Sequence, residues 1–306
     1  MSKSTFSSDE GIWLKGNLHG HSTFSDGELS PQQVFDGYRG RGYDFFSLTD
    51  HNLYRKYDYA DDWLILIPGF ELTCYSKEKR IHLNFLQKGE KSLFAQNQRF
   101  AVENHEQTEL FIKQAKDDYL IMLNHPGWSL LEYRDVEAMD SLFAMEVFNY
   151  GSEWQDRVGE SSHFWDNALM GGKRWCALAT DDNHNQYNTS PGWPFDHQES
   201  DSFGGWVMVK AKSRSQEAIT EALEKGSFYS STGPEIHDFF VQDGIAHVFC
   251  SPVSRIIFKG ERRNYIRQIG SNLTGFSTPL CGNREYVRVE CIDAEGKVAY
   301  SNPIYL

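Results

Sequence analysis

Two histidines and an aspartate lie close together near the start of this 306-residue sequence. In the stretch NLHGHSTFSDGELSP, His19 and His21 are one residue apart and Asp26 follows. Alternate residues of a β-strand share a face, so a strand through this stretch would point both imidazoles the same way. Neutral imidazole and carboxylate are ligands that zinc, manganese and iron prefer. Taken alone, the stretch fits either a metal site or surface histidines before a turn.

Residues of the same two kinds lie in five later apolar runs, mostly at their ends. They are Asp50 and His51 in DFFSLTDHN, Glu71 in LILIPGFELT, His82 in RIHLNFL, His125 in YLIMLNHPGW, and Asp181, Asp182 and His184 in WCALATDDNH. Each alone also fits a structural role, such as a turn cap or a core histidine. Six imidazoles with the carboxylates of Asp26, Glu71 and Asp182 give nine candidate ligands. One ion takes roughly four to six ligands, so nine suit two or three divalent ions, with Glu71 bridging a pair. No thiolate belongs to the set, so zinc, manganese, iron and magnesium all stay open.

The apolar runs predict strands that alternate with helices. Strands are expected over residues 12–19, 44–51, 64–74, 80–86, 119–125, 143–150, 175–182 and 205–211, and helices over 31–42, 103–118, 131–140, 161–174 and 213–226. This alternation predicts an α/β fold with a mainly parallel sheet, open or closed into a barrel. Such folds build their sites at the carboxyl ends of strands, where the candidate ligands lie. Ser30 is expected to cap the helix over residues 31–42, and Ser213 or Ser215 is expected to cap the helix over residues 213–226.

The texture of the sequence changes after GSFYSSTGP. Residues 235–306 show short alternating runs, separated in two places by the turn signals DG and EG. This pattern predicts a small antiparallel β unit. We therefore expect two domains, residues 1–233 and residues 234–306.

Charge and composition limit the classes of partner. The formal net charge of −13 argues against a broad surface for nucleic acid or anionic membrane. Bound metal ions could still attract an anionic small molecule, because they reverse the local field. Five scattered cysteines without a CxxC pair, no signal-peptide core and no span-length apolar run together predict a cytoplasmic protein.

The ordered set HGH…SDG, TDHN, GFELT, IHLN, NHPG and DDNH resembles the PHP superfamily, named for polymerase and histidinol phosphatase. The resemblance covers roughly residues 13–233 and implies a distorted (β/α)7 TIM-like barrel with a trinuclear metal centre. It implies that His19, His21, Glu71 and Asp182 hold the first ion, that Glu71, His82 and His125 hold the second, and that Asp26, His51 and His184 hold the third. Asp50 and Asp181 would then support the ligands from behind.

The end of the chain resembles a narrower branch of that superfamily. GSFYSSTGP and EYVRVECIDAEGKVAYSNPIYL are similar to the tail of carbaryl-hydrolase-like proteins. That branch includes a hydrolase of an aryl carbamate ester, and most of its members are predicted phosphoesterases.

The resemblance and the ligand set together predict a metal-dependent phosphoesterase, with a metal-bridging hydroxide that attacks a small phosphate ester. Glu71, Asp182 and His184 would be its catalytic residues. Two alternatives stay open: hydrolysis of an ester, amide or carbamate at the same centre, and a binding module without catalysis. Residues 185–206, rich in aromatic side chains, would form a lid in the former case.

Candidate substrate contacts are Arg55 for a phosphate and, at or near strand ends, Tyr54, Trp128, Tyr150 and Tyr229. The expected partner is a small phosphorylated molecule, with no nucleic acid and no membrane. The oligomeric state stays open.

Overall fold

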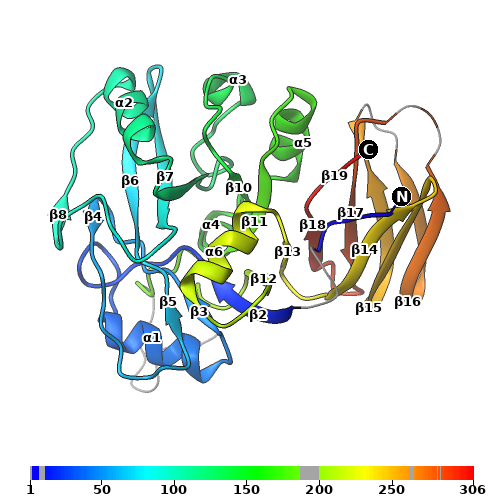
Figure 1. Cartoon of the computed structure of the whole chain (residues 1–306), viewed down its shortest axis with the longest axis horizontal. Coiled ribbons are helices and arrows are strands. Elements are labelled where there is room, and N and C mark those ends of the chain that lie inside the picture. The colour runs from blue at the N-terminus through cyan, green and yellow to red at the C-terminus, as the bar shows by residue number, and fades with distance from the viewer. Residues whose placement is uncertain (1, 7–10, 187–199, 262–264, 281, 283) are drawn as a thin grey trace.

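The computed structural model describes residues 2–6, 11–186, 200–261, 265–280, 282 and 284–306. Two lobes lie side by side, and the chain ends N and C both lie at the smaller one (Figure 1). The described helices belong to the larger lobe: α1 Pro31–Gly40, α2 His105–Ala115, α3 Tyr133–Val136, α4 Tyr150–Asp156, α5 Ser162–Met170 and α6 Gln216–Glu224. None of the helices in these ranges is both long and apolar enough to cross a membrane.

A five-stranded sheet runs through the larger lobe in the order β11-β10-β9-β7-β6. Its strands are β6 Gly69–Ser76, β7 Lys79–Gln87, β9 Tyr119–Leu123, β10 Ala144–Asn149 and β11 Cys176–Thr180. The pairs of β10 are parallel, but β7 runs antiparallel to both β6 and β9. The expectation of a mainly parallel sheet was wrong here, since two of the four strand pairs are antiparallel. For β6 and β7 the reason is that only Lys77 and Glu78 separate them. A parallel crossover needs a dozen or more residues.

The other large sheet has twelve strands and links the two lobes. Its strands are β1 Ser2–Ser4, β2 Ile12–Asn17, β3 Phe45–Phe46, β5 Ile65–Leu66, β12 Trp206–Ala211, β13 Phe228–Ser231, β14 Ile236–Gln242, β15 Ile245–Lys259, β16 Ile266–Pro279, β17 Tyr286–Ile292, β18 Val298–Ser301 and β19 Ile304–Tyr305. The short strands β4 Leu53–Tyr54 and β8 Gln98–Arg99 form a separate pair. Antiparallel pairing of β13 with β18 carries the sheet from one lobe into the other. The domain boundary after residue 233 therefore stays a prediction. The start of the chain also joins the smaller lobe, because β1 pairs with β14 there.

Single backbone bridges join the two sheets at the end where the histidines lie. Gly20 pairs with Asn183 on one side, and His51 pairs with Glu71 on the other. Within the described ranges the sheets share no longer ladder, so the closed (β/α)7 barrel stays a prediction. The mixed α/β class is confirmed.

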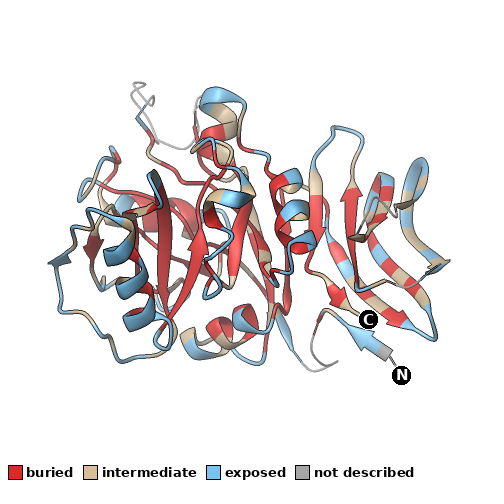
Figure 2. Ribbon diagram, turned by 90° about the horizontal axis from the view of Figure 1, so that it is seen from above, coloured by how far each residue is buried: buried red, intermediate tan, exposed pale blue. Residues whose placement is uncertain are grey.

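One core cluster fills the space between the two sheets. It brings Leu14 and Val207 of the large sheet together with Met122 and Leu178 of the five-stranded sheet. Figure 2 shows buried residues along the strands of the larger lobe, with exposed residues on the outer faces of its helices. In the smaller lobe, buried and exposed residues alternate along the strands, as expected for a sheet with one covered face (Figure 2).

The helix starts follow the expected capping chemistry. Ser30 caps α1 and exchanges side-chain and backbone hydrogen bonds with Gln33, so Pro31 takes the first helical position, where its missing N–H is not needed. Ser215, and not Ser213, caps α6. Helix α4 was not predicted, because its seven residues are too few to show a helical period.

Candidate metal centre

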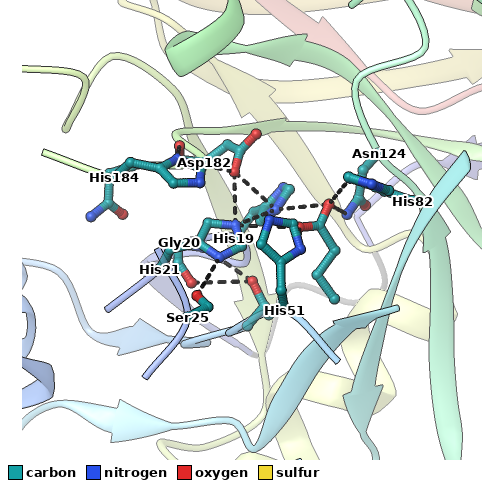
Figure 3. A network of polar contacts seen from close by, with 12 residues as sticks. His19, Gly20, His21, Ser25, His51, His82, Asn124, Asp182 and His184 are labelled. Carbon is teal, nitrogen blue, oxygen red and sulfur yellow. Dashed lines mark hydrogen bonds and ion pairs between the residues drawn. The ribbon is translucent and has the colours of Figure 1, made fainter. Parts of the chain in front are cut away.

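The nine candidate ligands face one another across the space between the two sheets, but not all of them lie at the carboxyl ends of strands, as was expected. His19 and His21 follow β2, Asp26 and His51 lie on loops, Glu71 is on β6, His82 is on β7, His125 follows β9, and Asp182 and His184 follow β11. Figure 3 shows the side chains of His19, His21, His51, His82, Asp182 and His184 gathered around one point. Residues 163 positions apart in sequence are thereby brought within contact, as with His19 and Asp182.

Glu71 lies at the middle of the cluster and is fully buried. Its Oε1 atom is 3.1 Å from Nδ1 of His82 and 3.2 Å from Nε2 of His125. Its Oε2 atom is 2.9 Å from Nδ1 of His51 and 3.3 Å from Nε2 of His21. Two oxygens of one carboxylate thus face two different pairs of imidazoles, which is the arrangement of a bridging ligand.

Asp182 faces the two histidines after β2. Its Oδ1 atom lies 3.1 Å from Nε2 of His19 and 2.9 Å from Nε2 of His21. On the outer side, Asp26 lies 3.4 Å from Nε2 of His184 and 3.6 Å from Nε2 of His51. The side chain of Asp26 is half exposed, so this side of the cluster opens to solvent.

Four histidines hold one ring nitrogen outward and the other toward the cluster. The outward Nδ1 atoms contact an oxygen: Glu146 for His19, Ser25 for His21, Ser129 for His125 and the backbone carbonyl of Asp182 for His184. Such contacts orient the ring and let Nδ1 carry the proton when Nε2 binds a cation, as is usual for histidines that bind metals.

Several buried atoms of the cluster have no hydrogen-bond partner. They are Nδ1 of His51, Oε2 of Glu71, Nδ1 of His82 and Oδ1 of Asp182. A buried polar atom without a partner costs about 1–3 kcal/mol. Because these atoms converge, cations placed among them would satisfy all four. The donor set therefore fits divalent metal ions.

Three groups within the described residues have ligand atoms close enough to hold an ion each. They are His19, His21, Glu71 and Asp182; His51, Glu71 and His82; and His21, Asp26, His51 and His184. The first has the members expected from the sequence. The second contains His51 in place of His125, although Nε2 of His125 lies 3.2 Å from Glu71.

Acids and bases of the cluster shift one another's pKa. Burial would raise the pKa of Glu71, but the imidazoles of His82 and His51 help to hold it well below its usual range. Burial would lower the pKa of His184, but Asp26 raises it to about 9. The cluster thus keeps its carboxylates charged, which suits them as ligands.

Glu146 on β10 was not predicted from the sequence, yet it supports two candidate ligands. Its buried carboxylate accepts hydrogen bonds from Nδ1 of His19 at 2.6 Å and from the backbone N–H of His125 at 2.6 Å. The hydroxyl of Thr180 donates to it as well. The available signal was a carboxylate in the middle of the apolar run FAMEVFNY.

Asp50 and Asp181 face away from the cluster and support its loops. Asp50 accepts hydrogen bonds from the backbone N–H of Ser22 and from the hydroxyl of Ser25, which also contacts His21. Asp181 accepts three backbone N–H groups of residues 203–205 and the hydroxyl of Tyr38. Burial raises the pKa of Asp181 to about 7.

Four of the five expected substrate contacts lie elsewhere, and Tyr54 among them is buried in a core cluster. The guanidinium of Arg55 stacks on the ring of Phe24, 4.0 Å from its centroid. Tyr150 begins α4, and Tyr229 is buried in the core beside Trp13. None of these four residues lines the cavities at the cluster. For the tyrosines the sequence signal was ambiguous, because an aromatic residue at a strand end fills a core as readily as it lines a pocket.

A cavity of about 210 Å³ lies over the cluster. Seven of the nine candidate ligands line it, all except His19 and His21. Trp128, Ser152, Gln155 and Gln186 form the remaining wall with Gly151. Trp128 therefore lies where it was expected. Most of the predicted lid, residues 185–206, lies outside the described residues.

Comparisons with known proteins give one short match in sequence and several matches in structure. No protein-family profile matches the chain. A segment of 43 residues, 14% of the chain, is 42% identical to the DNA polymerase/3'-5' exonuclease PolX of Bacillus subtilis, of which it spans only 8%. An amidohydrolase structure from Chromobacterium violaceum is 14% identical, with a TM-score of 0.39 over 60% of this chain and 90% of that one.

A solved two-domain protein from Bacteroides vulgatus, containing a predicted PHP-like metal-dependent phosphoesterase, matches over nearly the whole length. The match covers 97% of this chain and 96% of that one, with a TM-score of 0.54 and 17% identity. The chain shares this two-lobed fold. At that identity the likeness establishes the fold, and the chemistry depends on the cluster itself.

Proposed function

We propose that the chain is a metal-dependent hydrolase of the PHP superfamily that cleaves small phosphate esters at a trinuclear centre. The observation that carries the proposal is that six imidazoles and three carboxylates converge, and that four of their buried atoms lack hydrogen-bond partners. The likeness in fold to the Bacteroides vulgatus protein supports it.

The residues of the cluster would divide the ions among them. His19, His21, Glu71 and Asp182 would hold the first, Glu71 with His82 and His125 the second, and Asp26, His51 and His184 the third. Bound divalent ions supply a water-derived nucleophile at neutral pH and offset charge on the attacked group.

The charge of the ligand set favours an anionic substrate. The carboxylates of Asp26, Glu71 and Asp182 offset only half the charge of three divalent ions, so the cavity would attract a phosphate. Asp26 and His184 lie on the solvent side, where a substrate enters. Glu146 and Ser25 would keep the rings of His19 and His21 oriented while the substrate is bound and cleaved.

The test is purified protein whose metal content is measured by mass spectrometry, reconstituted with Mn²⁺ or Zn²⁺ and assayed on phosphomonoesters, phosphodiesters, carboxylic esters and aryl carbamates. We expect turnover of a phosphate ester, and loss of metal and turnover in His21→Ala and Asp182→Ala. His237→Ala, an exposed histidine of the smaller lobe, is the control and should change neither. Turnover of carbamates alone would replace the proposal by the second candidate below.

The second candidate is hydrolysis of an ester, amide or carbamate by the same cluster. The carbaryl-hydrolase-like tail favours it, and so does the exposed ring of Trp128 beside the cluster, which would pack on an aryl group. A metal-loaded protein that turns over no substrate of either kind would support the binding module.

A further inference from the structure

A second cavity adjoins the one over the metal centre. Its volume is about 590 Å³, and it shares Asp26, His51, His82 and Trp128 with the first cavity. A ligand bound at the cluster can therefore extend into it. What the second cavity adds to the wall is mainly polar or cationic, with Arg80 at its edge.

Arg80 is the one lysine or arginine among the described residues that line these two cavities. It is on β7 two residues before His82, and alternate residues of a strand share a face. Its position on the strand thus directs it to the side of the sheet on which the metal ligand lies.

The guanidinium of Arg80 is exposed, and within the described ranges no hydrogen bond, ion pair or aromatic ring engages it. Other arginines of the larger lobe are committed: Arg39 pairs with Asp61, and Arg214 pairs with Asp44. The carboxylate that shares the cavity with Arg80, Asp26, faces the histidines instead. Arg80 is therefore available to a ligand.

Trp128 supplies an apolar surface beside the metal ligands and lines both cavities. Its side chain is 48% exposed, although its ring packs edge-on against His125 at 5.0 Å and lies 6.2 Å from His82. Leu130, which is 79% exposed, lines the same cavity. Large apolar side chains exposed beside a cluster of charges indicate a surface that a ligand covers.

We propose that Arg80 and Trp128 form a subsite for the part of the substrate that leaves, and that this part is a flat ring bearing a second anionic group. The ring would pack on Trp128 and the anion, typically a carboxylate, would pair with the guanidinium of Arg80, whose planar fork matches a carboxylate. The subsite rests on the proposed function in one respect: the bond that is cleaved is taken to be a phosphate ester.

The test measures binding without turnover. Phenylphosphonate and 4-carboxyphenylphosphonate, which lack a cleavable ester, are titrated by calorimetry into protein reconstituted with Mn²⁺. We expect the carboxylated ligand to bind at least tenfold more tightly. Arg80→Gln should reduce this preference to near parity, and Arg80→Lys should keep part of it. Arg134→Gln, an exposed arginine outside both cavities, should retain it in full.

Trp128→Leu separates the ring from the charge. It should weaken both phosphonates by a similar factor and leave the carboxylate preference in place. Equal affinity of the two ligands in the unmodified protein, or a preference that persists in Arg80→Gln, would overturn the subsite.

The outcome is independent of whether the enzyme cleaves phosphate esters. An Arg80-dependent preference without turnover of any phosphate ester would keep the subsite and reject the proposed function. Turnover of phenyl phosphate and 4-carboxyphenyl phosphate with equal kcat/KM, together with equal phosphonate affinities, would keep the proposed function and reject the subsite.

Discussion

The Nδ1 atom of His19 lies 2.6 Å from Oε1 of Glu146, and both side chains are fully buried. The same carboxylate accepts the hydroxyl hydrogen of Thr180 and the backbone N–H of His125. His19 follows a strand of the twelve-stranded sheet, whereas His125 follows a strand of the other. One buried carboxylate therefore sets two candidate ligands relative to each other across the gap between the sheets.

Glu146→Gln should weaken metal binding without altering any ligand. The amide would place an NH2 group against donors that now point at a carboxylate oxygen, and the ring of His19 would lose its fixed orientation. Loss of such a supporting contact typically costs 10- to 100-fold in metal affinity. Competition titration against a chromophoric chelator measures the change. Glu137→Gln, on the exposed end of α3, is the control, and equal affinities of the two variants would show that Glu146 does not support the site.

Glu71→Gln should remove more metal than His82→Ala. Both oxygens of Glu71 face imidazoles, so an amide there weakens two ion positions at once, whereas His82 contacts Glu71 through one nitrogen. The measurement is metal stoichiometry by mass spectrometry after gel filtration. We expect at least two ions to be lost in Glu71→Gln and no more than one in His82→Ala. A loss of a single ion in both variants would contradict a bridging role.

Much of the fold was predictable because buried strands are short apolar runs with turn residues around them. The strands at 12–17, 79–87 and 119–123 lie where the sequence placed them. The run DFFSLTDH predicted a strand of eight residues, but β3 covers only Phe45 and Phe46, since the rest turns into the cluster. Direction of pairing was not predictable from alternation alone, because it depends on the two-residue turn at Lys77 and Glu78.

The candidate ligands were predictable because residue type and a place in or next to a short apolar run are both local, although Glu71 and His82 lie within strands rather than at their ends. Glu146 contacts the ring of His19, which is 127 residues away in sequence. Asp201 accepts the backbone N–H of His184, which is 17 residues away. Such partners become visible only when the strands are placed in space. Tyr229 shows the converse error, since an aromatic residue before a domain boundary fills the core there.

Metal binding should release protons and strengthen as pH rises. Asp26 raises the pKa of His184 to about 9 against the effect of burial, so at pH 7 this ring holds a proton that a cation must displace. Calorimetry in buffers of different ionisation enthalpy measures the number released. We expect at least one proton per protein at pH 7 and fewer at pH 9. Identical heats in all buffers at pH 7 would contradict this shift.

The stability of chelator-treated protein should change with pH in the opposite direction to metal affinity: it should fall as pH rises. A group whose pKa is raised on folding stabilises the fold fully below its unfolded value, here 6.5 for His184, and this contribution is lost as pH rises through about 9. Thermal unfolding with chelator present should therefore show a falling Tm between these two pH values. His184→Gln should flatten that fall.

Asp201→Asn should weaken the binding of the third ion alone, the one that Asp26, His51 and His184 would hold. Asp201 is buried and accepts the backbone N–H groups of His184 and Asn185, at 2.7 Å and 3.0 Å. Asp182 and Asn185 flank this turn with positive φ values of 54° and 56°, a conformation that is costly unless its surroundings hold it. An amide would accept one N–H and present its own NH2 group to the other, at a cost of about 1–3 kcal/mol.

The loop that carries His184 should then lose its position, while His19, His21 and Glu71 keep theirs. Metal titration of Asp201→Asn should show one weakened site and the remaining sites unchanged. Asp62→Asn, at an exposed loop position, is the matched control. Uniform weakening of every site would indicate instead that Asp201 stabilises the whole lobe, and unchanged binding would show that the turn holds His184 without it.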